Sequence, residues 1–109
     1  MSDRELLEQA AKAAEVDWFR RTDGGMWLKS GGIWNPITDD GDALRLVVKL
    51  GLDVCIDSRQ EHEPHTHVIG FRDDRTATTI DAIEAHGDPY AATRRAIVRA
   101  AAEIGKEMK

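Results

Sequence analysis

The stretch NPITDDGDALRLVVKLGL, residues 35–52, predicts one complete helix and decides the fold. Pro36 resets the chain, and either Thr38 or Asp39 can cap the helix. Gly51 stands where a left-handed glycine ends a helix. The positive end of a helix favours anions, and three aspartates crowd its first turn: Asp39, Asp40 and Asp42.

The body of this helix is apolar around most of its circumference. Only Arg45 and Lys49 form a polar strip, so we expect this helix to be the best buried in the chain. The apolar residues of the body are Ala43, Leu44, Leu46, Val47, Val48 and Leu50.

The composition is that of a single globular domain. The chain has 109 residues, of which 41% are hydrophobic and 32% charged, so it can bury a core without disulfides or metal ions. Its net charge of −5 argues against a general nucleic-acid binder, because such a protein needs a basic surplus to replace the counterions on phosphate.

The only cysteine, Cys55, cannot form an internal disulfide and indicates a reducing compartment. The start of the sequence has no apolar signal segment, and no apolar run reaches the length that a membrane crossing requires. We therefore expect a cytoplasmic protein that does not bind membranes.

The residues before the central helix predict a second helix and a β-hairpin. Residues 2–15 have an amphipathic pattern whose apolar face is mostly alanine, so we expect it to pack closely. Within residues 16–34, two short β-type runs flank an Asp-Gly-Gly turn, which favours a hairpin because glycine adopts positive φ without steric cost. Ile33 and Trp34 are candidates for a third short strand.

The end of the chain predicts another well-marked helix. Asp88 caps it, Pro89 takes its first position, and Gly105 is expected to end it. The side chains expected to face inward from this helix include Tyr90, Ile97, Ala101 and Ile104.

The predicted fold class is α+β, with an antiparallel sheet of about five to six short strands layered with three helices. Three of the strands, at residues 53–58, 66–71 and 76–84, follow the central helix and are expected to form a meander. The predicted order is helix, two or three strands, helix, three strands, helix. Residues 1–109 are expected to form one α/β sandwich domain.

The stretch WNPITDDGDALRLVVKLGLDVCID, residues 34–57, together with the late stretch YAATRRAIVRAAAEIG, resembles the phage ABA sandwich domain family of small bacteriophage and prophage proteins. The resemblance covers nearly the whole chain and implies an α/β/α layering and a phage or prophage origin. It implies no activity and no catalytic residues. The residues that carry it are Trp34, Asn35, Pro36, Asp39, Asp40, Ala43, Leu44 and Leu46, then Ala92, Arg94, Ala96, Ile97, Ala100 and Ala101.

The segment EHEPHTH, residues 61–67, is the densest chemical cluster. His65 and His67, two apart on an extended segment, project to the same side and can place two imidazoles on one metal, with Glu63 or His62 as a further ligand. A loop needs polar residues in any case, however, and no zinc-binding motif accompanies these histidines. We therefore expect no resident cofactor.

All three tryptophans, Trp18, Trp27 and Trp34, lie in the glycine-rich hairpin segment. Aromatic rings give the largest burial per residue, so two of the three are expected in the core. An exposed tryptophan suits a protein contact, and Trp27 is the strongest candidate for that role.

Five arginines are candidates for a local basic patch that could contact nucleic acid. The alternative interpretation is that they are solvated on strand ends and on a helix face. They are Arg72, Arg75, Arg94, Arg95 and Arg99.

Two functional hypotheses follow. The first, which we favour because no catalytic constellation is present, is a small non-enzymatic accessory protein of phage or prophage origin. It would bind an unknown host or phage protein or associate with itself. The second is a nucleic-acid-binding module that uses the arginine patch. A metal-dependent enzyme built on the histidines ranks below both.

Overall fold

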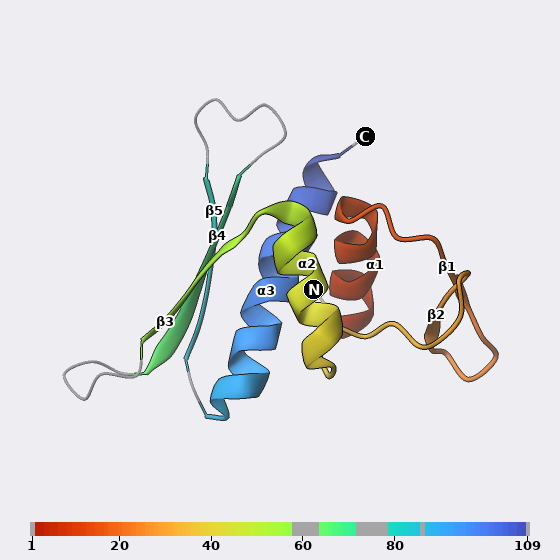
Figure 1. Cartoon of the computed structure of the whole chain (residues 1–109), viewed down its shortest axis with the longest axis horizontal. Coiled ribbons are helices and arrows are strands. Elements are labelled where there is room, and N and C mark those ends of the chain that lie inside the picture. The colour runs from red at the N-terminus through yellow and green to blue at the C-terminus, as the bar shows by residue number, and fades with distance from the viewer. Residues whose placement is uncertain (1, 58–63, 72–78, 86, 109) are drawn as a thin grey trace.

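The computed structural model describes residues 2–57, 64–71, 79–85 and 87–108. The α+β class is confirmed, in the order helix, two strands, helix, three strands, helix (Figure 1). The elements are α1 (Asp3–Ala13), β1 (Trp18–Arg20), β2 (Met26–Leu28), α2 (Asp40–Leu50), β3 (Asp53–Asp57), β4 (His65–Phe71), β5 (Thr79–Ala85) and α3 (Pro89–Glu107).

The strands form two separate antiparallel sheets and not the single sheet that was expected. One is the β1–β2 hairpin, and the other has the strand order β3-β4-β5. The expected third strand at Ile33 and Trp34 is reduced to an isolated bridge between Ile33 and Trp27. Gly31 and Gly32, both at positive φ, turn the chain immediately before this point, so little extended backbone is left to pair.

The helices lie on one side of the three-stranded sheet (Figure 1). α3 packs against β4 and β5, α1 packs against α3, and α2 lies beside α3. The α/β/α layering implied by the resemblance therefore differs from the described structure, in which the sheet is an outer layer. The outer face of the sheet carries polar side chains, among them Asp53, Asp57, His65 and His67, which a second helix layer would have to bury.

The contact between α1 and α3 is made by small side chains. Ala10 and Ala11 of α1 and Ala101 and Ala102 of α3 have no exposed surface. A Cβ atom at Gly105 would overlap the backbone carbonyl group of Gln9. The close packing expected of the alanine face is confirmed.

The prediction that Gly105 ends the last helix is wrong. α3 continues to Glu107, and Gly105 lies within it at the contact with α1. The glycine is required by the short distance between the two helix backbones and not by a left-handed cap.

The limits of α2 confirm its sequence signals, but its predicted burial is wrong. The Asp39 side chain caps the helix, and Gly51 is left-handed and donates its N–H to the Val47 carbonyl. Leu44 and Val48, however, are 61% and 75% exposed. α2 buries only a narrow face against α3, and α3 is the better buried helix.

Gly105→Ala is expected to lower the free energy of unfolding by about 1–3 kcal/mol, because the added methyl group forces α1 away from α3. The direction of this change is diagnostic. At an ordinary position inside a helix, replacing glycine by alanine raises the free energy of unfolding by about 1 kcal/mol. Urea unfolding of the two proteins measures the difference.

Gly87→Ala is the matched control, because a Cβ at Gly87 meets no atom within 4 Å. Its unfolding free energy is expected to stay within about 0.5 kcal/mol of the parent or to rise slightly. A Gly105→Ala variant as stable as the parent would contradict the close contact between the helices.

Candidate functional site

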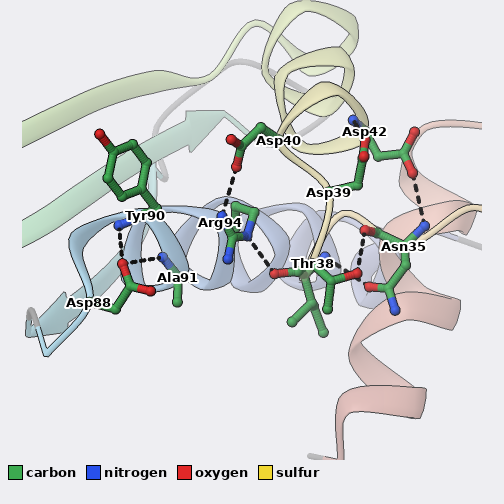
Figure 2. A network of polar contacts seen from close by, with 10 residues as sticks. Asn35, Thr38, Asp39, Asp40, Asp42, Asp88, Tyr90, Ala91 and Arg94 are labelled. Atoms are coloured by element: carbon green, nitrogen blue, oxygen red, sulfur yellow. Dashed lines mark hydrogen bonds and ion pairs between the residues drawn. The ribbon is translucent and has the colours of Figure 1, made fainter.

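The aspartates at the start of α2 hold the backbone around the helix end (Figure 2). Asp39 Oδ2 accepts the N–H of Asp42 at 2.8 Å. The Asp42 carboxylate accepts the N–H of Asn35 at 2.9 Å and a guanidinium N–H of Arg45 at 3.1 Å. These hydrogen bonds give Asp39 and Asp42 a structural role, because both carboxylates hold backbone N–H groups at the start of α2.

Arg94 of α3 fixes the start of α2 against α3. Its Nε donates to the Ile37 carbonyl at 2.7 Å, and its Nη1 donates to Asp40 Oδ1 at 2.7 Å (Figure 2). The Arg94 side chain is only 18% exposed, whereas that of Asp40 is 74% exposed. The position of α2 therefore depends on a largely buried guanidinium group that holds a backbone carbonyl and a carboxylate together.

An apolar groove of about 610 Å³ lies between α2, β3 and the first half of α3. Its two charged lining residues, Asp40 and Arg94, form an ion pair with each other. The remaining lining residues are Ala43, Leu44 and Val47 from α2, Val54 and Ile56 from β3, and Pro89, Tyr90, Thr93 and Ile97 from α3.

The groove exists because one helix is too narrow for three strands. A helix with its side chains is about 10 Å wide and neighbouring strands are about 4.8 Å apart, so a helix covers about two strands. α3 packs against β4 and β5. Val54 and Ile56 of β3 therefore line a space that α3 does not fill, and α2 bounds this space on its other side.

Large apolar side chains around the groove are exposed. Ile56 of β3 is 56% exposed and Tyr90 of α3 is 70% exposed, in addition to Leu44 and Val48 of α2. The expectation that Tyr90 faces inward is wrong, because it occupies the first turn of α3 and stands out from the helix on the side of Asp40 (Figure 2). Leu44, Ile56 and Tyr90 line the same groove, so their exposed side chains form one apolar patch that is a candidate interaction site.

The three tryptophans of the hairpin segment differ in burial. Trp34 is buried in the core, in agreement with the expectation that two of the three tryptophans pack there, and its burial removes it from the contact candidates. Trp18 and Trp27 are half-buried, with the guanidinium groups of Arg20 and Arg21 at 5.1 and 4.3 Å from their ring centres. A contact role for Trp18 or Trp27 stays a prediction.

The arginines of α3 lie beside carboxylates. Arg94 pairs with Asp40, Arg95 pairs with Asp3 at 2.9 Å, and Arg99 pairs with Glu84. The other two candidates, Arg72 and Arg75, lie outside the described residues. The nucleic-acid hypothesis stays a prediction, and these ion pairs do not favour it because they neutralise the charge that phosphate would need.

His65 and His67 lie on the outer face of β4, with Cys55 opposite His67 and Asp57 opposite His65. His62 lies outside the described residues. Over the described ranges, no three or more histidine, cysteine, aspartate or glutamate side chains are placed to hold one metal ion. A metal site that includes His62 stays a prediction.

Comparisons with protein-family models, with curated proteins and with solved structures find no match to this chain. The resemblance to the phage ABA sandwich domain family stays an expectation from the sequence. None of the helices in the described part of the chain has both the length and the apolar character needed to span a bilayer.

Sequence reasoning missed Leu44, Ile56 and Tyr90 as candidate contact residues. One signal was present: α2 carries more apolar residues than a single packed face can bury, which indicates a second contact. Ile56 and Tyr90 gave no such signal. Ile56 is exposed because α3 is too narrow to cover β3, and Tyr90 is exposed because it lies in the first turn of α3.

Arg94→Lys is expected to lower the unfolding free energy by about 1–2 kcal/mol, because lysine cannot keep the forked contact with the Ile37 carbonyl and Asp40. Asp40→Asn removes only the exposed half of the contact and is expected to cost less than about 1 kcal/mol. Urea unfolding of both variants measures the two costs. If Asp40→Asn destabilises the protein as much as Arg94→Lys, the backbone carbonyl is not the important partner.

Proposed function

We propose that this chain is a small non-enzymatic accessory protein, of phage or prophage type, that acts by binding a protein through the groove between α2, β3 and α3. The supporting observation is the continuous apolar surface in and around this groove, where Leu44, Ile56 and Tyr90 are exposed. Exposed apolar side chains that lie together in a groove are a candidate surface for a protein contact.

The energetics of this surface fit a protein contact. Full burial of one large apolar side chain contributes about 1.5–3 kcal/mol. Association costs about 4–15 kcal/mol in lost translational and rotational freedom. Leu44, Ile56 and Tyr90 together can offset part of that cost, and an aromatic residue such as Tyr90 is a favoured anchor at interfaces.

The chemistry of the groove supports binding over catalysis. The titratable side chains among its lining residues are Asp40, Tyr90 and Arg94, and two of them already pair with each other. Arg94 in addition donates to the Ile37 carbonyl. Asp40 and Arg94 hold the start of α2 against α3, which favours a structural role for this pair over a catalytic one.

The phage or prophage part of the proposal is supported by the resemblance of residues 34–46. The structure gives several of these residues a role in building one wall of the groove. Asp39 caps α2, Asp40 holds Arg94, and Leu44 projects at the groove. The residues that carry the resemblance therefore help to build α2, which forms one wall of the proposed binding surface.

Photo-cross-linking tests the proposal directly. Tyr90 is replaced by the photo-reactive residue p-benzoylphenylalanine, and the chain is irradiated in the cells that express it. We expect a discrete cross-linked protein adduct, because Tyr90 lies in the proposed contact. Adding Leu44→Glu is expected to reduce the adduct about tenfold or more, since a charge in a buried apolar contact is strongly unfavourable.

Ile83 is the matched control position, because its side chain is 55% exposed on the outer face of β5, away from the groove. The same photo-reactive residue at position 83 is expected to give little adduct. Equal adducts from positions 83 and 90, or no adduct from position 90, would contradict the proposed site.

A further inference from the structure

We propose that a hollow on the opposite side of α2 from the groove binds a straight-chain fatty acid, with the acyl chain against its apolar lining and the carboxylate at its rim. This inference concerns a second site and does not rest on the proposed function. Four observations support it: the place of the hollow on α2, its apolar lining, the charges at its rim and the exposure of Ile33.

The hollow has a volume of about 640 Å³ and lies between the end of α1, the β1–β2 hairpin and α2. Figure 1 shows the hairpin and the three-stranded sheet on opposite sides of the helices. Arg45 and Lys49 of α2 line the hollow, whereas Leu44 and Val47 of the same helix line the groove. With 3.6 residues per turn, these two pairs lie on opposite faces of α2. The hollow and the groove are therefore separate sites.

The lining of the hollow is apolar apart from three charged residues at α2. Ala14, Trp34 and Leu46 are buried, and Val16 and Leu28 are half-buried. Pockets for small ligands commonly have volumes of about 300–1,000 Å³ and a lining of this kind. A hydrocarbon chain suits it, because such a chain brings no polar group that would stay unpaired after burial.

The three charged residues leave one positive charge in excess. Asp42 is already engaged, because its carboxylate accepts the N–H of Asn35 at 2.9 Å and a guanidinium N–H of Arg45 at 3.1 Å. Lys49 is exposed, and within the described part of the chain no carboxylate lies at ion-pair distance from its ammonium group. Arg45 is also exposed and keeps further N–H donors beyond the one that Asp42 accepts. The rim therefore offers N–H donors and a net positive charge to an anion.

This excess charge fits a carboxylate. Arg45 and Lys49 are one helical turn apart on the same face of α2, so one carboxylate can reach both side chains. A carboxylate carries a single negative charge, whereas a phosphate monoester carries about −1.5 to −2 at neutral pH. Glu15 and Asp17, which flank Val16 in the sequence, are exposed and do not line the hollow.

Ile33 is a large apolar residue of the lining that remains 63% exposed. Gly31 and Gly32, both at positive φ, turn the chain immediately before it and so fix its place beside the hollow. An acyl chain in the hollow would cover Ile33 and remove apolar surface from water, which is favourable.

Isothermal titration of the purified full chain with sodium dodecanoate, below the concentration at which it forms micelles, tests this proposal. We expect saturable binding of one dodecanoate per chain. Dodecyltrimethylammonium has the same chain length and a cationic head, and it is expected to bind about tenfold more weakly or not at all. Dodecyl phosphate is expected to bind no more tightly than dodecanoate.

Lys49→Glu is expected to weaken dodecanoate binding about fivefold at low salt, and the difference from the parent is expected to shrink at high salt because ions screen surface charges. Lys49→Arg keeps the positive charge and is expected to retain binding. Lys29→Glu is the matched control, because it changes the net charge equally at an exposed position outside the lining.

Ile33→Glu is expected to weaken binding about tenfold or more, because it places a carboxylate beside the acyl chain. Ile83→Glu makes the same change at an exposed position on the outer face of β5 and is expected to have no effect. Leu44→Glu alters the groove on the other side of α2 and is likewise expected to leave dodecanoate binding unchanged.

The indole N–H signals of the ¹⁵N-labelled protein locate the ligand independently of these variants. Of the three tryptophans, Trp34 lines the hollow, so its signal is expected to shift most during the titration. No saturable binding, or equal binding of dodecanoate and dodecyltrimethylammonium, overturns the proposal. Equal losses from Lys49→Glu and Lys29→Glu also overturn it, as does a loss from Leu44→Glu as large as that from Ile33→Glu, which would place the ligand in the groove.

Discussion

The close approach of α1 and α3 is the constraint on which the rest of the structure depends. Alanines on both helices and Gly105 let the two backbones come near enough that a single added methyl group would meet the Gln9 carbonyl group. This contact positions α3, and α3 in turn packs against α2, β4 and β5. Small side chains bury little area individually, so the contact gains its stability from many close contacts and not from large apolar groups.

Because of this arrangement, α3 has to pack against α1 and against the three-stranded sheet at the same time. One side of α3 is committed to α1 and another to the sheet, where it covers two of the three strands. Arg94 holds α2 beside α3, so α2 does not fill the remaining space over β3. The apolar side chains of Val54 and Ile56 then line an open groove. The candidate binding surface thus results from the way in which the helices pack on the sheet, and the same elements that form the core also form this surface.

Much of the fold follows from local sequence signals, because caps and turn glycines act within a few residues. Asp39, Gly51 and Asp88 mark helix limits that the structure confirms. Gly105 shows where such reasoning fails: a glycine required by a neighbouring helix and one required by a left-handed cap look the same in sequence. The candidate site was less predictable, because the exposure of a residue such as Tyr90 depends on which elements pack together. Periodicity identifies an apolar face but not the surface that covers it.

The central claim is that the groove between α2, β3 and α3 is the surface through which the chain binds a protein, and a comparison of photo-cross-linking from the groove with cross-linking from the outer face of the sheet tests it most directly. A photo-reactive residue reports only on a partner within its reach, so the comparison locates the contact as well as detecting it. We expect a discrete adduct from position 90 and little adduct from position 83. Equal adducts from the two positions, or no adduct from position 90, would contradict the claim.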